Sequence, residues 1–184
     1  DLDNVYSFNG NTTAFVEMED GINEYGLSVG LTFIYPTIIK AGFNAGLLVR
    51  YLLEKCRTTN EAIQTLKQIP IASQQTLTIA DNTGNIAVVE CNAENVEVIK
   101  ANEKDNFVIA TNEFSSENMK RYNNYNIDDW KAEERYNVGY NALVTNKNNF
   151  SFDLAKDILS GKYGFMCQYD RKTNADTVWS VIYD

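Results

Sequence analysis

Residues 76–91, TLTIADNTGNIAVVEC, decide the fold class. Two short runs rich in β-branched and aliphatic residues flank the turn Asp81–Asn85. This turn holds the Asp, Asn and Gly residues that tight β-turns favour. The stretch therefore predicts two antiparallel strands joined by a hairpin.

Further strands are predicted on both sides of this hairpin. Downstream, NVEVIKA (95–101) and FVIAT (107–111) are expected to join it in one antiparallel sheet. Upstream, TTAFVEM (12–18) and GLSVGLTFI (26–34) predict two strands joined by a turn with Gly at both ends. The run TVWSVIYD (177–184) alternates its side chains with the period of a strand.

Two helices are predicted before the hairpin. Asn44 is of the residue type that caps helices and begins a helix over residues 45–56. Thr58 and Glu61 have the spacing of a capping box, and the helix that they begin ends before Pro70. Both helices carry apolar stripes, so we expect them to cover one face of the sheet.

Two more helices are predicted in the second half of the chain. One runs from about Asp128 to Val144, and Ser151 caps a shorter one. Their expected apolar positions are Tyr136, Tyr140, Leu143 and Val144 in the first, and Ala155, Ile158 and Leu159 in the second. The order of strands, paired helices, strands, paired helices and a last strand indicates an α+β fold with antiparallel sheets.

The composition of the chain limits its partners. The net charge is −9, from 25 acidic and 16 basic residues, and the basic residues form no stripe. Nucleic-acid binding is not expected, because it needs clustered Lys and Arg. Membrane association is not expected either, because no apolar run is long enough to span a bilayer and no signal peptide is recognisable. Three widely spaced cysteines favour reduced thiols and a cytoplasmic location.

The chain contains no histidine. This excludes a Ser-His-Asp triad, a Cys-His dyad and a His-ligated zinc site built from this chain alone. No pair of cysteines has metal-ligand spacing, and we expect no cofactor. If the protein is a hydrolase, its base must be another group, and a free α-amino group with a pKa of about 7.7–8.0 is one option.

An ordered series of motifs resembles one known family. GINEYGLSVGLTFIYP (21–36), the stretch from AGFNAGLL to AVVEC (41–91), FVIATNEF (107–114) and the C-terminal segment from GKYGF to VIYD (161–184) follow one another as in its members. The chain resembles the choloylglycine hydrolase and penicillin acyltransferase-like group of N-terminal nucleophile (Ntn) hydrolases. Each motif is generic when taken alone, but their order covers nearly the whole chain.

The resemblance implies a four-layer αββα sandwich and cleavage or transfer of a linear amide C–N bond. It implies an N-terminal Cys nucleophile whose own α-amine is the base, which agrees with the absence of histidine. Asp1 is not such a nucleophile, so we expect residues 1–184 to form a single Ntn-hydrolase-like domain that is incomplete at both ends. The nucleophile then lies in a preceding segment or a separate chain, or catalysis has been lost, and the chain alone should hydrolyse no amide.

Asn112 and Thr32 are the candidate catalytic residues. The family has a Thr-Asn where this chain has Thr111-Asn112, and its Asn helps bind the substrate carbonyl, so the resemblance makes Asn112 an oxyanion-hole donor. The alternative is an Asx-turn at the end of a strand. Bile-salt-cleaving relatives carry Asn where this chain has Thr32, which implies a second donor there, although Thr is also a common strand residue.

Three further residues are candidates for substrate binding. Tyr35 follows the strand that carries Thr32, where it lines an acyl pocket or simply packs in the loop. Gln168 and Arg171 fall where relatives hold an Arg near the nucleophile, although Arg171 beside Asp170 also fits an ordinary surface position. Asn23 and Glu24, in contrast, are expected to be structural residues of the turn.

The three cysteines are expected to be buried thiols with no catalytic role: Cys56, Cys91 and Cys167. The alternative to an amide hydrolase or acyltransferase is a non-catalytic Ntn-like domain that binds a small molecule or a partner. A third reading is a structural fragment. The expected partners are a small-molecule amide and either a second copy of the chain or a missing N-terminal segment.

Overall fold

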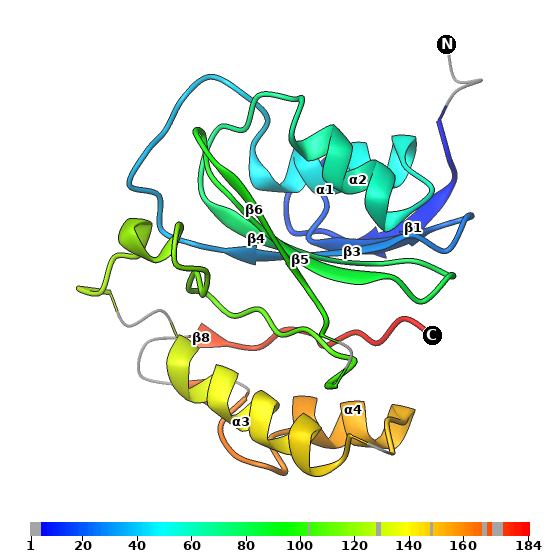
Figure 1. Cartoon of the computed structure of the whole chain (residues 1–184), viewed down its shortest axis with the longest axis vertical. Helices are drawn as coiled ribbons and strands as arrows, with labels where there is room; N and C mark the ends of the chain where they lie inside the picture. The colour runs from blue at the N-terminus through cyan, green and yellow to red at the C-terminus, as the bar shows by residue number, and fades with distance from the viewer. Residues whose placement is uncertain (1–4, 103, 128–129, 148, 167–168, 171–174) are drawn as a thin grey trace.

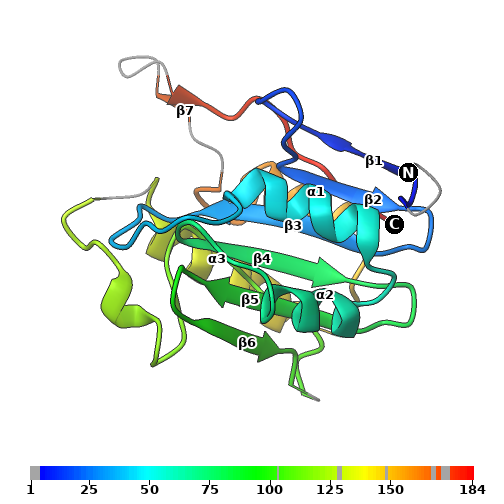
Figure 2. The same cartoon turned by 90° about the horizontal axis from the view of Figure 1, so that it is seen from above.

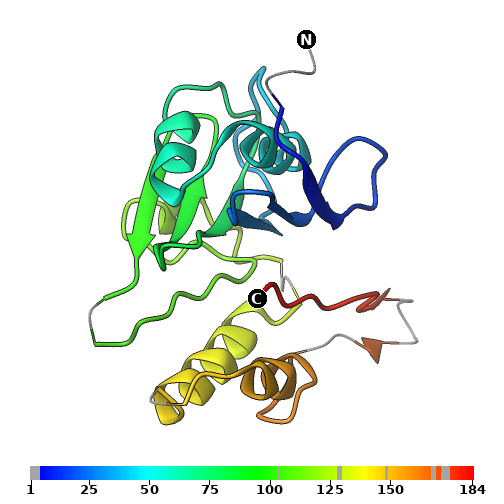
Figure 3. The same ribbon diagram turned by 90° about the vertical axis from the view of Figure 1, so that its right-hand side faces the viewer.

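A computed structural model describes residues 5–102, 104–127, 130–147, 149–166, 169–170 and 175–184. Its layers can be followed in Figure 1: helices α1 and α2 cover one face of a β-sheet, and helices α3 and α4 lie on the other side of it. Extended segments run between the sheet and the second pair of helices, as Figure 3 shows from the side. The α+β class predicted from the sequence is confirmed.

The main sheet has six antiparallel strands in the order in which they occur along the chain (Figure 2). Their bounds are β1 Phe8–Asn11, β2 Asp20–Asn23, β3 Ser28–Phe33, β4 Gln75–Ala80, β5 Ile86–Cys91 and β6 Val96–Lys100. β4 and β5 form the predicted hairpin, with Thr78 opposite Val88. A small second sheet pairs β7 Tyr169–Asp170 with β8 Ala175–Asp176.

The two helices above the sheet begin as their caps predict. Helix α1 spans Ala45–Lys55, and the Asn44 side chain accepts a hydrogen bond of 2.9 Å from the backbone N–H of Leu47. Helix α2 spans Thr59–Leu66, and the Thr58 hydroxyl accepts one of 3.2 Å from the N–H of Glu61. The helices pack on the sheet through a core that includes Leu27, Val29, Leu48, Leu52, Leu53, Leu66, Leu77, Ile79 and Val89.

The sheet face turned away from α1 and α2 is polar. Because side chains alternate along a strand, the residues that lie between the core positions point to this face. Two rows cross the strands there in register: Thr32, Thr76, Glu90 and Glu97, and Asp20, Gly30, Thr78 and Val88. The C-terminal segment and the loop after residue 112 cover this polar face, and the candidate site lies there.

The strand predicted over residues 12–18 is wrong, because this stretch is the loop between β1 and β2. The N–H of Glu17 bonds to the carbonyl of Ala14, and Phe15 has a positive φ of 47° and a fully exposed ring. No apolar face can form from residues that point into solvent in this way. The strand beside β3 is formed instead by residues 20–23, and residues 8–11 pair with that strand on its other side.

The strand predicted over residues 107–111 does not join the sheet. This segment follows the edge strand β6 and crosses to the other side of the sheet, where it runs between the sheet and helices α3 and α4 (Figure 1). The Phe107 ring lies 5.8 Å from that of Tyr140 and 6.2 Å from that of Phe150. Its apolar contacts therefore hold it in the layer of extended segments.

The C-terminal run 177–184 is extended but belongs to neither sheet among the described residues. It lies in the same layer as residues 107–111, as Figure 3 shows. The four layers of the expected αββα sandwich are therefore α1 with α2, the six-stranded sheet, the extended segments, and α3 with α4. Within the described part of the chain, no helix is long and apolar enough to cross a membrane.

Helix α3 spans Ala132–Thr145 and α4 spans Phe152–Leu159, with a short 3₁₀ helix, η2, over Lys120–Tyr122. Ser151 caps α4 as predicted, accepting a bond of 3.2 Å from the N–H of Leu154. The apolar stripe predicted for α3 is wrong in part, because Tyr140 and Val144 are exposed. The buried residues of α3 are small instead: Ala132, Gly139 and Ala142.

Candidate active site

Asn112 links three parts of the fold. Its side chain is only 7% exposed and follows directly on the extended segment 107–111. The amide Nδ2 donates to the carbonyl oxygen of Phe33, at the end of β3, at 2.8 Å. The amide Oδ1 accepts from the Arg135 guanidinium of α3 at 2.6 Å. The side chain therefore bridges β3 and α3, and these bonds do not form the Asx-turn that was the alternative.

Thr32 lies on the polar face of the sheet, directly before Phe33. It lines an open cavity of about 800 Å³ between this face and the C-terminal segment. The sheet side of the cavity carries Asp20, Gly30, Thr32 and Thr78, and the opposite side carries Leu159, Val178, Trp179 and Val181. This volume lies in the range of small-molecule sites, and one wall is apolar while the other is polar.

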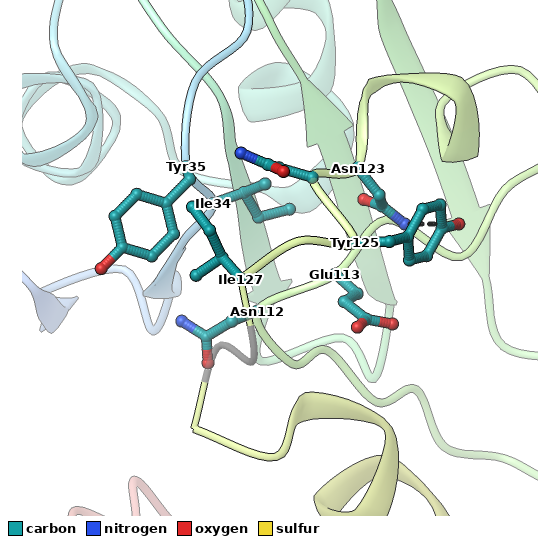
Figure 4. Close-up of a pocket in the computed structure, with 8 residues that line it drawn as sticks. Ile34, Tyr35, Asn112, Glu113, Asn123, Tyr125 and Ile127 are labelled. Carbon is teal, nitrogen blue, oxygen red and sulfur yellow. Dashed lines mark hydrogen bonds between the residues drawn. The ribbon is translucent and has the colours of Figure 1, made fainter.

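Tyr35 and Asn112 share a second, much smaller pocket, shown in Figure 4. It has room for about one water molecule, with roughly 10 Å³ free for the centre of a water. The Tyr35 ring extends away from Asn123 and Tyr125 in this view and packs edge-on against Phe33 at 5.2 Å. This pocket is too small for a substrate.

The structure thus brings the predicted catalytic residues to one end of β3. Thr32 and the carbonyl that binds Asn112 belong to consecutive residues of that strand. Their side chains line different cavities, and of these two only the larger, beside Thr32, has room for a substrate. Gln168 and Arg171 lie outside the described residues.

Glu90 is a buried residue of this region that the sequence analysis missed. Its carboxylate is 1% exposed and accepts four hydrogen bonds of 2.6–3.1 Å, from the backbone N–H and the hydroxyl of both Ser115 and Ser116. These bonds fix the loop that follows Asn112 to the polar face of the sheet. The signal in the sequence is a single Glu in the apolar run IAVVEC, at a position that faces away from α1 and α2.

Gln74 holds the Tyr35 loop in the same way. Its side chain is fully buried, and its Oε1 accepts from the N–H and the hydroxyl of Thr37 at 3.0 and 2.6 Å. Its Nε2 donates to the carbonyls of Tyr35 and Tyr122 at 3.2 and 3.1 Å. A buried amide with four bonds keeps the loop after β3 in one position.

Asp20 attaches the C-terminal segment to β2. Its carboxylate accepts from Asn11 Nδ2 at 2.8 Å, from Trp179 Nε1 at 3.3 Å and from the Tyr183 hydroxyl. Burial, together with the bond to Asp20, raises the pKa of Tyr183 above its usual value. The phenol therefore stays protonated and remains a donor to Asp20 at neutral pH.

Cys56 and Cys91 are buried, as predicted, and Cys167 lies outside the described residues. Burial raises the pKa of the Cys56 thiol, and it raises that of Cys91 to about 12. Neither residue supplies a thiolate near neutral pH, so neither is a nucleophile. The described residues contain no group of His, Cys, Asp or Glu that could hold a metal ion.

Asn23 and Glu24 have the structural roles predicted for them. The Asn23 amide makes four hydrogen bonds, two to carbonyls of α1 and its C-cap and two from N–H groups of its own turn. Glu24 accepts from the N–H of Ser7 at 2.9 Å. The stretch 21–36 is therefore a turn anchored to α1, followed by the strand that carries Thr32.

Comparison with solved structures shows the fold of this chain. A variant of conjugated bile acid hydrolase from Clostridium perfringens matches 92% of it with 18% identity and a TM-score of 0.60. The N-acylethanolamine-hydrolyzing acid amidase ortholog of Caenorhabditis elegans matches 86% with 19% identity and a TM-score of 0.60. The chain spans 66% of the first protein's length, just under two thirds, and 74% of the second's.

Among curated proteins, none matches the chain significantly. A family model, in contrast, matches residues 3–184, which is nearly every residue of the chain. This match confirms the family resemblance predicted from the sequence motifs. The chain belongs to the acyl-coenzyme A:6-aminopenicillanic acid acyl-transferase family of Ntn hydrolases.

Proposed function

We propose that this protein cleaves a linear amide C–N bond or transfers the acyl group of such an amide. The observation that carries the proposal is the family match over residues 3–184. We further propose that an N-terminal Cys outside residues 1–184 is the nucleophile and that its own α-amine is the base. The buried, high-pKa thiols of Cys56 and Cys91 support a nucleophile from elsewhere.

In this proposal the Asn112 amide and the Thr32 hydroxyl donate to the oxyanion that forms when the thiolate attacks the carbonyl. A prearranged N–H or O–H stabilises negative charge as it develops on the carbonyl oxygen, and one such donor is worth roughly 3–4 kcal/mol. The bond from Asn112 Nδ2 to the carbonyl of Phe33, the residue next to Thr32, supports this assignment, although the two side chains line neighbouring cavities and not one common cavity. The Asn112 side chain is held by two other elements, so it needs little reorganisation during the reaction.

The substrate occupies the 800 Å³ cavity beside Thr32 in this proposal, with its acyl part against Leu159, Trp179 and Val181. Tyr35, Gln168 and Arg171 remain candidates for substrate binding, the last two on the family resemblance alone. We also propose that residues 1–184 form one incomplete domain, which associates with an N-terminal segment or with a second copy. A cytoplasmic location and no nucleic-acid or membrane partner complete the proposal.

The decisive experiment compares two proteins on a panel of acyl amides. Residues 1–184 alone should release no amine, whereas the protein with the residues that precede Asp1 should do so and lose this activity to a thiol reagent. Amine release by the 1–184 chain that a thiol reagent blocks would overturn the external nucleophile. A longer protein that binds amides without cleaving any would establish the non-catalytic alternative.

The role of Asn112 is tested in the longer protein with Asn112→Asp. This variant keeps an oxygen for Arg135 but has no N–H to donate to an oxyanion. We expect kcat to fall by about 10²–10³-fold with a much smaller change in KM. Thr32→Val tests the second donor in the same assay. An unchanged kcat for Asn112→Asp would show that Asn112 is structural only.

A further inference from the structure

Arg135 binds two oxygen atoms from different parts of the fold. It lies in the first turns of α3 and its side chain is half-buried. Its Nη2 donates to Asn112 Oδ1 at 2.6 Å, and its Nε donates to the backbone carbonyl of Trp130 at 2.7 Å. Two bonds from one planar guanidinium fix the direction in which it approaches the Asn112 amide.

The Asn112 amide has two possible orientations, and only one presents a donor. In the structure Oδ1 faces the guanidinium, and Nδ2 faces the carbonyl of Phe33. A flipped amide would set its N–H groups against the N–H groups of Arg135 and its oxygen against the Phe33 oxygen. Both contacts would be repulsive, so the cation on one side and the carbonyl on the other select a single orientation.

The guanidinium also changes the strength of the amide as a donor. A cation that donates a hydrogen bond to Oδ1 draws electron density from the amide nitrogen, and hydrogen bonds in series strengthen one another in this way. One Nδ2 hydrogen is used by Phe33, and the described residues show no partner for the other. Arg135 thus places a cation directly behind the N–H that would meet an oxyanion.

We propose that Arg135 is a positioning residue of the active site, which orients and polarises the Asn112 amide from α3. This inference rests on the proposed role of Asn112 as an oxyanion donor. It assigns to α3 a part in catalysis, which the guanidinium exerts through the Asn112 amide. Lys in its place keeps the charge but cannot bind both oxygens in the same planar geometry.

The first test needs no activity and uses the Asn112 side-chain NH₂ signals in a ¹⁵N–¹H correlation spectrum of the chain. Asn112→Ala identifies these signals by their loss. Arg135→Met should shift both signals and speed their exchange with water, and Arg135→Lys should give intermediate changes. Arg121→Met is the control and should leave the Asn112 signals in place. Arg121 is also an Arg with a hydrogen-bonded side chain, but its guanidinium binds the Tyr122 hydroxyl and lies over the Tyr122 ring. Unmoved Asn112 signals in Arg135→Met would overturn the inference.

The second test uses kinetics of the longer protein. Arg135→Met should lower kcat by about 10- to 100-fold, the size typical for loss of a group that orients a functional side chain. KM should change less than about threefold, and Arg135→Lys should recover part of the loss.

If Asn112→Asp lowers kcat and Arg135→Met does not, the inference is wrong and the proposed function stands. If NH₂ signals shift but neither variant lowers kcat, Arg135 orients Asn112 and the proposed role of Asn112 fails. Should Arg135→Met not fold, Arg135→Lys decides by the same readouts.

Discussion

The turn that precedes β3 depends on one buried amide, and its removal gives a quantitative test. Asn23 is 5% exposed. Its Nδ2 donates to the carbonyls of Leu53 and Cys56 at 2.9 and 2.7 Å, and its Oδ1 accepts from the N–H groups of Tyr25 and Leu27, both at 3.0 Å. Asn23→Ala removes all four bonds and leaves two carbonyls at the end of α1 and two N–H groups of the turn without this partner.

The expected loss is about 3 kcal/mol in the free energy of unfolding. A buried hydrogen bond contributes about 1 kcal/mol net, and partial relaxation of the site recovers some of the total for four bonds. For a chain of this size, such a loss lowers Tm by about 6–12 °C. The measurement is urea unfolding followed by circular dichroism, with an unchanged m-value expected because the same surface unfolds.

Asn23→Asp separates hydrogen bonding from shape. A carboxylate of the same size would face the Leu53 and Cys56 carbonyls without an N–H, so its folded-state pKa should lie above the unfolded value. The penalty is then full at neutral pH and decreases as the pH falls through that raised pKa. Asn60→Ala, at an exposed position of α2, is the control and should change stability by less than about 0.5 kcal/mol. A loss below about 1 kcal/mol in Asn23→Ala would refute the reasoning.

Three further predictions concern other buried groups. Burial alone would raise the pKa of Asp81, but hydrogen bonds from Thr83 and Thr59 outweigh it and lower the pKa to about 2. Unfolding titrations should therefore show that roughly 1–2 kcal/mol of stability, present above about pH 4, is lost as the pH falls toward 2, and that Asp81→Asn lacks this component. Glu90→Gln should lower the free energy of unfolding by about 2 kcal/mol and make the loop around Ser115 sensitive to limited proteolysis. Glu94→Gln, at an exposed position, is the control and should do neither. Equal cleavage rates for the two variants would contradict the anchoring role of Glu90. In a Cys167→Ser variant, a thiol reagent at pH 8 should label Cys56 and Cys91 only after urea is added, and rapid labelling of the folded protein would count against their burial.

The parts of the fold that could be predicted are those with local signals. The turn at Asp81–Asn85 and the caps Asn44, Thr58 and Ser151 each act over a few residues, and each is found as expected. β1 and β2 were missed because FNGN and DGIN consist mostly of turn-forming residues. They are strands because β3 offers β2 an edge to pair with and β2 in turn offers one to β1, and tertiary pairing of this kind overrides local preference.

The candidate site was predictable in part for the same reason. Asn112 was found through its place in a series of motifs, whereas nothing near Arg135 in the sequence marks it. A single Arg on a helix is ordinary, and its role depends on a contact with Asn112 across 23 positions of the chain. The cavity beside Thr32 likewise depends on Trp179 and Val181, which line it from the C-terminal segment. No local pattern in the sequence shows that this segment lies against the polar face of the sheet.

The bonds from Trp179 and Tyr183 to Asp20 have a consequence for synthesis on the ribosome. Each bond joins two residues that are far apart in the sequence, with separations of 159 and 163 positions. The hairpins, α1 and α2, in contrast, form from neighbouring stretches within the first 100 residues. Local contacts close fast, and distant ones carry the largest loop-closure cost. The sheet with α1 and α2 can therefore assemble while translation continues, but the part of its polar face around Asp20 stays open to chaperones until residues 179–183 have emerged. Attachment to Asp20 is the step that ends this vulnerable interval.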